Sequence, residues 1–382
     1  MTTFDEAGFQ ALLAEVAAFV RGPGEEYAAE IERARAVPDK LWTDLRERGY
    51  LRLAAPVEYG GRGIPFSRYL ELLELVSMSH ASVRMIVHVC NGVWRAMDQF
   101  ATDAQRRQFV LPQVSGDIRV AFTLTEPTAG TGADLRSSVE REGETYYLSG
   151  EKHLITFGVS CDYWLLFARL AGTTGKDGTV ALLVDRNSPG VTVESMPDTM
   201  GVRGTDHGRL IFDRTPVPVA HRLGEEGRGL EVALGGFLTP SRIAVAMSCV
   251  GLARRAQELA VEHAATRTTF GKPLAARQAI SFALAENAAD IEAARQLTLY
   301  AARQWEGGDQ RADTLSSMAK LTAVEMLTRV TDKALQVHGG IGYWESSTIE
   351  RVYRDARAQR FEEGTNEIQK TVIARQVLRP AR

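Results

Sequence analysis

The period at which apolar residues recur changes twice along the chain, and this limits the folds that it can adopt. In residues 4–118 apolar positions follow one helix face, as at Phe9, Leu12, Leu13, Val16 and Phe19. From about residue 119 the apolar runs become short, β-branched or aromatic, and are separated by Gly, Asp, Asn and Pro: VAFTLT, TYYLSG, YWLLFARL, TVALLVD and RLIFD. From residue 228 the helical period returns and holds to the end. The order predicts a multi-domain α+β protein: an N-terminal helical domain (1–118), a middle, mostly antiparallel β domain (119–225) and a C-terminal helical bundle (226–382).

Local signals predict several boundaries inside the helical parts. Pro38 is typical of the first turn of a helix, which we expect to run to Arg48 and end before Gly49. The glycine-rich stretch 58–65 predicts a connection, followed by a helix from about Phe66. We expect a short helix at 105–111, and an apolar stripe at 318–337 that packs in the bundle core.

Composition narrows the function classes. The chain has 382 residues, a formal net charge of −3 and no dense basic run, so it gives no reason to expect a nucleic-acid partner. Its three cysteines lie far apart and its seven histidines show no metal-ligand spacing, which argues against disulfides and a metal site. The N-terminus is acidic, and no apolar run reaches 18 residues. We therefore expect a cytoplasmic protein without a membrane span.

The segment VYRDARAQRFEEGTNEIQ at 352–369 contains the most informative carboxylate. Glu363 directly precedes Gly364, and a glycine there allows the tight turn that puts a carboxylate into a pocket. A functional acid is one interpretation of this turn. The other is an acidic turn that caps the following helix.

Three further segments distinguish between these interpretations: FTLTEPTAGTGAD (122–134), TRTTFGKPLAARQAIS (266–281) and QVHGGIGYWE (336–345). Together with E-G-T, and in this order, they resemble the acyl-CoA dehydrogenase family of flavoproteins. The resemblance extends from about residue 40 to residue 378. It implies FAD-dependent α,β-dehydrogenation of an acyl thioester.

Such a reaction needs a base for the weakly acidic α proton and an electron sink for the β hydride. No side chain accepts hydride reversibly, so a flavin suits the second task. The resemblance makes Glu363 the base and sends the hydride to flavin N5. Some relatives place the base before an arginine of the bundle, but the matching pair here is Ser241-Arg242, and serine cannot act as a carboxylate base. Arg242 is then a positioning group near the substrate, or alternatively an ordinary helix-surface arginine.

The resemblance also assigns the FAD contacts. Around the isoalloxazine it places Phe122, Leu124, Thr125, Thr131, Leu154 and Thr156. At the diphosphate and adenosine it places Arg267, Phe270, Gln278, Gln336, Gly339 and Gly340, while Thr365 and Glu367 close the site. Leu154 replaces a common aromatic, and Phe157 stands where Asn is usual. These departures bear on redox tuning. In this family the bundle contacts reach a flavin held mainly by another subunit, which implies a homodimer or homotetramer.

Four positions bear on the substrate. Thr131 stands in for a serine that contacts it, and Gly364 lies beside the base. Arg84 resembles an arginine that binds a distal carboxylate in relatives acting on glutaryl-type thioesters; the alternative is an exposed arginine at the helix edge. Glu362 either lines the pocket, where two adjacent acids would raise at least one pKa, or turns outward to Arg360 or Arg357.

Several properties stay open at this point. The carrier is coenzyme A or an acyl carrier protein, and the electron acceptor is a separate partner such as an electron-transfer flavoprotein. An oxidase or monooxygenase on the same scaffold is a second interpretation. A catalytically silent flavin-binding protein is a third, although a retained Glu363 counts against it.

Overall fold

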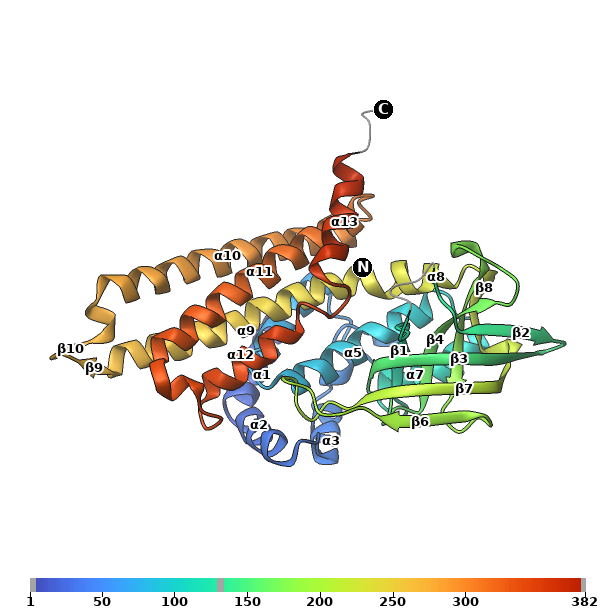
Figure 1. The fold of residues 1–382 in the computed structure, drawn as a ribbon, viewed down its shortest axis with the longest axis horizontal. Helices are drawn as coiled ribbons and strands as arrows, with labels where there is room; N and C mark the ends of the chain where they lie inside the picture. Colours follow the sequence, from blue (N-terminus) through green and yellow to red (C-terminus); the bar gives the residue numbers. More distant parts are fainter. Residues whose placement is uncertain (1–4, 129–133, 379–382) are drawn as a thin grey trace.

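The computed structural model describes residues 5–128 and 134–378, and its order of elements confirms the predicted fold class. Figure 1 shows the sheet at one end of an elongated molecule and the long helices α9, α10 and α11 stacked toward the other end. The N-terminal helices pack below α9 and beside the sheet, so three segments of the chain meet near the middle.

The N-terminal part is helical, as its apolar period predicts. Its helices are α1 Glu6–Arg21, α2 Pro23–Ala34, α3 Asp39–Glu47, α4 Phe66–Val76, α5 Ala81–Asp98, α6 Asp103–Gln105 and α7 Leu111–Ser115. Pro38 is the residue before α3 and not in its first turn, and α2, which begins at Pro23, was not anticipated. The short helix expected at 105–111 contains a wide π turn at Arg106–Val110.

The middle part is a sheet whose described strands run in the order β6-β7-β3-β2-β4-β5-β8, with β1 beside β4. The strands are β1 Val120–Thr123, β2 Ser138–Glu142, β3 Thr145–Thr156, β4 Tyr163–Leu170, β5 Thr179–Asp185, β6 Val191–Ser195, β7 His207–Pro218 and β8 Arg222–Gly227. Pairing is antiparallel except that β4 pairs in parallel with β1 and β2. Three polar strands, β2, β6 and β8, escaped sequence reasoning because they lack apolar runs.

The C-terminal part is a bundle built around α9. Its helices are α8 Gly229–Glu231, a π turn Val232–Leu238, α9 Thr239–Thr266, α10 Gln278–Glu306, α11 Ala312–His338, α12 Thr348–Ala358 and α13 Asn366–Val377. The expected stripe on α11 lies in the core, with Val324, Leu327, Val330, Ala334 and Val337 buried. One expectation was wrong: the helical period does not hold throughout, because a small hairpin of β9 Thr268–Thr269 and β10 Lys272–Pro273 separates α9 from α10.

One segment is long and apolar enough to cross a membrane by length and composition alone. It is Gly229–Thr266, and 83% of its most apolar window is buried inside the protein. Core helices of bundles pass the same test, and the position of α9 between α10, α11 and α4 is that of a core helix.

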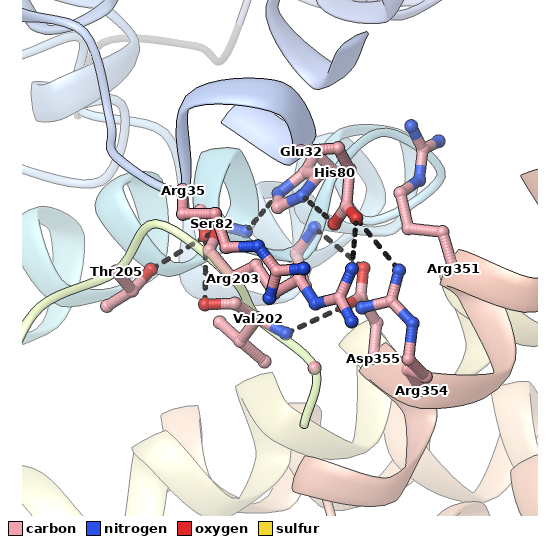
Figure 2. A network of polar contacts seen from close by, with 12 residues as sticks. Glu32, Arg35, His80, Ser82, Val202, Arg203, Thr205, Arg351, Arg354 and Asp355 are labelled. Carbon is pink, nitrogen blue, oxygen red and sulfur yellow. Dashed lines mark hydrogen bonds and ion pairs between the residues drawn. The ribbon is translucent and has the colours of Figure 1, made fainter. Parts of the chain in front are cut away.

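A polar network ties the three parts together (Figure 2). Glu32 of α2 lies at its centre and accepts hydrogen bonds from His80 Nε2 at 3.1 Å, Arg203 Nη1 at 3.1 Å and Arg354 Nη2 at 2.8 Å. These partners come from the start of α5, the β6–β7 connection and α12. Burial alone would raise the pKa of Glu32, but the His80 hydrogen bond and the Arg354 charge outweigh it and lower the pKa from 4.5 to about 2.

Glu32→Gln is therefore expected to lower the free energy of unfolding at pH 7 by roughly 1–2 kcal/mol, because water screens part of these pairs. The folded-state pKa is depressed, so the contribution is complete above pH 4.5 and is lost as the pH falls toward 2. Urea unfolding at pH 7 and pH 4 checks this: the gap between wild type and variant should shrink at pH 4. Glu30→Gln on the same helix is the control, and a gap independent of pH would contradict the network.

Candidate active site

The turn before α13 holds Glu363 in an unusual backbone conformation. Glu363 has φ 54° and Gly364 has φ 94°, so two successive residues lie in the left-handed region. That region is disfavoured for a residue with a side chain, and such strain persists where the surroundings impose it. The turn is held by Gln369 Nε2, which donates to both carbonyl oxygens of these residues at 3.0 Å, and by the buried Lys320, whose ammonium donates to the Gly364 carbonyl.

The Glu363 carboxylate points into the protein, toward α5 and α9. Ser241 Oγ donates to its Oε1 at 2.8 Å, and His88 Nε2 lies 2.9 Å from the same Ser241 Oγ. The His88 ring nitrogen is 3.9 Å from the carboxylate. The interpretation of Glu363 as a helix cap is wrong, because α13 begins after Thr365 and has no side-chain cap. The side chain is 15% exposed, so most of it is shielded from water.

Arg242 is not a surface residue. It is 5% exposed, and its Nη1 donates to Asp313 Oδ1 at 2.7 Å while its Nε donates to the Glu363 carbonyl at 3.4 Å. The residue therefore supports the turn that carries Glu363, which agrees with the positioning interpretation.

Both alternatives for Glu362, and both for Arg84, need correction. Arg84 is fully buried, and its two terminal nitrogens donate to the two Glu362 oxygens at 2.8 Å each. Arg360 pairs instead with Glu325. Arg84 is thus neither exposed at a helix edge nor available for a substrate carboxylate, and Glu362 does not turn outward. A charge-assisted, two-pronged pair is the strongest partner that a buried guanidinium can have.

This pair also separates the two adjacent acids. Burial would raise the pKa of Glu362, but the Arg84 charge and hydrogen bonds hold the pKa below its ordinary value. The expectation that neighbouring acids raise each other's pKa is therefore wrong for Glu362. Its carboxylate turns to Arg84 while that of Glu363 turns to Ser241.

Several expected cofactor residues meet at the ends of β1 and β3. His153 N donates to the Thr125 carbonyl at 3.1 Å, so the segment after β1 runs beside the end of β3 that carries Leu154 and Thr156. Leu124 is buried, Thr125 and Thr156 are half-buried, and Leu154 is 54% exposed. Phe122 stacks on Phe237 with ring centres 4.3 Å apart. Thr131 lies outside the described residues.

The remaining expected cofactor residues gather at the opposite end of the bundle. The rings of His263 and His338 stack at 4.5 Å, which brings the ends of α9 and α11 together. An open depression of about 300 Å³ lies there, lined in part by Gln336, Gly339 and Gly340. Near it lie the exposed residues Arg267, Phe270 and Gln278, with Phe270 97% exposed.

The length of α9 separates this end from the base. Ser241 lies in its first turn and Arg267 follows its end, which at about 1.5 Å per residue puts them about 40 Å apart. One chain therefore cannot bring both groups to one cofactor. Thr365 and Glu367 lie at the other end, beside Glu363, at the start of α13.

Sequence reasoning missed four residues of the site: Ser241, His88, Lys320 and Gln369. Ser241 was considered only as a failed base, although a hydroxyl can orient a carboxylate. His88 lies one turn after Arg84 on α5, and this spacing put both on one face. Lys320 and Gln369 gave no local signal, because the backbone oxygens that they bind belong to a turn 44 and 5 residues away.

Comparisons with known proteins cover nearly the whole chain. Family models described as the N-terminal, middle and C-terminal domains of acyl-CoA dehydrogenase match residues 7–117, 121–215 and 227–378. An acyl-CoA dehydrogenase of Bacillus subtilis (strain 168) is 36% identical over 92% of this chain and 93% of its own. The structure of butyryl-CoA dehydrogenase from Megasphaera elsdenii matches with a TM-score of 0.93 and 32% identity, covering 99% of this chain and 100% of that one. A structure titled electron transferring flavoprotein of Acidaminococcus fermentans matches with a TM-score of 0.93 and 30% identity, covering 99% and 100%.

Proposed function

Because the chain belongs to the acyl-CoA dehydrogenase family of FAD-dependent oxidoreductases, we propose that it dehydrogenates an acyl thioester between Cα and Cβ with Glu363 as the base. One observation carries the assignment. The Glu363 carboxylate is held by Ser241 in a shielded site on a strained turn, where a structural acid would have no reason to be.

The residues around Glu363 divide the work. Ser241 fixes one carboxylate oxygen, and among the described residues no other hydrogen bond reaches the carboxylate, so Oε2 is left for the α proton. Arg242, Lys320 and Gln369 hold the carbonyl groups of the turn, so the base keeps its position. FAD, when bound, supplies the acceptor for the β hydrogen and its electron pair.

The residues present fit such a cofactor. Thr125 and Thr156 offer half-buried hydroxyls at adjoining chain segments, next to the exposed apolar Leu154. A side chain on Gly339 or Gly340 would meet nothing within 4 Å, so these glycines border open space that a ligand can approach. Arg267 is exposed, and its fork of donors suits a diphosphate.

We infer that the protein is a homodimer or a dimer of dimers in which the bundle end of one chain completes the cofactor site of another. The separation of about 40 Å along α9 supports this. So do the large exposed apolar side chains near that end, among them Phe270, Tyr343 and Trp344. Sedimentation of the holoprotein should give a dimer or tetramer, and a monomer that retains FAD would contradict the shared site.

The electron acceptor we propose is a separate electron-transferring flavoprotein, in line with the neighbour from Acidaminococcus fermentans. We further propose coenzyme A as the carrier, since the curated relatives are acyl-CoA enzymes. A reducing, cytoplasmic setting is supported by Cys90, Cys161 and Cys249, which are all buried free thiols.

The test is anaerobic reduction of the purified holoprotein by a panel of saturated acyl-CoA thioesters. The protein should carry about one FAD per chain, melt at a higher temperature with added FAD, and lose its flavin absorbance with at least one thioester. Slow reoxidation by air, but fast reoxidation by an electron-transferring flavoprotein, is expected. Fast reoxidation by air would instead favour the oxidase interpretation, and a protein that binds no FAD would end the proposal.

A further inference from the structure

A small cavity begins at the pair that holds the base. It is lined by Ser241 and His88 at one end and by Tyr69 of α4 and Arg95 of α5 at the other. On α5, Arg84, His88, Asn91 and Arg95 follow each other at spacings of four, three and four residues, so they share one helix face. Seven residues separate His88 from Arg95, so the cavity follows α5 for about 10 Å.

Most polar groups of the cavity wall already have partners. Ser241 and His88 bind each other, and the Asn91 side chain bonds with the backbone of Ala54, Tyr50 and Val87. Two donors differ. The Tyr69 side chain is 2% exposed, and its hydroxyl has no hydrogen-bond partner among the described residues.

Arg95 is the second donor without a partner. Within the described part of the chain it forms no ion pair, and its guanidinium lies 5.2 Å and 5.3 Å from the ring centres of Phe66 and Trp305. Burial lowers the pKa of Arg95 to about 10, and the neighbours that counter this effect are Tyr69 and the exposed Glu306. The side chain therefore stays charged at neutral pH while its charge is unpaired, which is costly in a low-dielectric setting.

We propose that Arg95 and Tyr69 bind the far end of the acyl group, and that this end is a carboxylate. Two donors that face one cavity require an acceptor, and the charge of the guanidinium favours an anion, which it can bind through two parallel hydrogen bonds. The preferred substrate is then the half-thioester of a dicarboxylic acid. This inference rests on the proposed function, because the other end of the same acyl group must lie at Glu363.

The size of the cavity says what must move. It measures about 10 Å³, enough for one water molecule. An entering acyl end takes the place of such a water and displaces Phe237, whose ring lies against Gly92, where a Cβ atom would approach it to 3.2 Å. The carboxylate recovers the hydrogen bonds of the water and neutralises the buried charge.

The role differs from the one that sequence gave to Arg84. Arg84 lies on the same face of α5, but Glu362 already occupies both of its terminal nitrogens. An unneutralised cation is present three turns further along the helix. The selectivity for an acidic acyl end therefore belongs to Arg95.

The experiment compares three CoA thioesters of equal chain length on the holoenzyme: a dicarboxylic half-thioester, its ω-hydroxy analogue and the plain monocarboxylic acyl-CoA. Wild type, Arg95→Gln, Arg95→Lys and Tyr69→Phe are measured by kcat/KM, with the exposed Arg107→Gln as the matched control. Tyr69→Phe keeps the volume, so it remains informative if the arginine variants fold poorly.

Wild type is expected to prefer the dicarboxylic substrate. Arg95→Gln should reduce its kcat/KM roughly thirtyfold or more, and Tyr69→Phe about tenfold, while the monocarboxylic substrate changes by less than about threefold. Arg95→Lys should fall between, because it keeps the charge but loses the fork. A wild type that prefers the hydroxy or plain acyl group, or equal losses on all three substrates, would overturn the inference alone. Failure of all three to reduce the flavin would overturn the proposed function as well.

Discussion

Glu363→Gln is expected to yield a folded protein that binds FAD and substrate but whose flavin is reduced about 10²–10⁴-fold more slowly, or slower still. Glutamine keeps the length of the side chain and can still accept the hydrogen bond from Ser241, but it cannot take the α proton. Stopped-flow loss of flavin absorbance under anaerobic conditions measures the step directly, separately from reoxidation.

Two variants make this result specific. Glu363→Asp keeps the carboxylate but withdraws it from Ser241, so it should be slow yet faster than the glutamine variant. Ser241→Ala keeps the base and removes only its orientation, so a smaller loss is expected. If the glutamine variant reduces flavin at the wild-type rate, the base is another group, and Glu362 is a poor substitute because Arg84 occupies both of its oxygens.

Arg84→Met is expected to lower the free energy of unfolding by about 3–5 kcal/mol, because it leaves the Glu362 carboxylate buried without its partner. Glu362→Gln should cost a comparable amount by leaving the guanidinium unpaired. Denaturant unfolding of the FAD-loaded protein at one fixed cofactor concentration gives both values.

The double variant Arg84→Met, Glu362→Leu provides the control. Removing both charges leaves an apolar contact of similar volume, so much of the stability should return. The interaction energy from this cycle should be large, since the two residues touch. Strictly additive losses would mean that the ion pair carries no energy of its own, and that each residue acts through separate contacts.

The order of helical and β segments, and the family that it indicates, follow from the sequence alone. Periodicity is a local property, so α1, α4 and α11 could be predicted from the spacing of residues such as Val16 and Val330. Glu363 could likewise be singled out, because Gly364 and the surrounding motif lie in one short stretch. Strands such as β6 were missed because their residues are polar and their pairing partners are distant.

Only the tertiary structure decided what each charged side chain does. Arg84 and Glu362 are 278 residues apart, and Ser241 and Glu363 are 122 apart, so no local pattern could pair them. Arg84 and Arg95 lie on one face of α5 and look alike in the sequence. One is neutralised and the other is not, because folding brings the turn before α13 beside Arg84, whereas Arg95 faces the rings of Phe66 and Trp305. A buried charge is defined by its neighbours in space, and that is the information that a sequence read along its length does not contain.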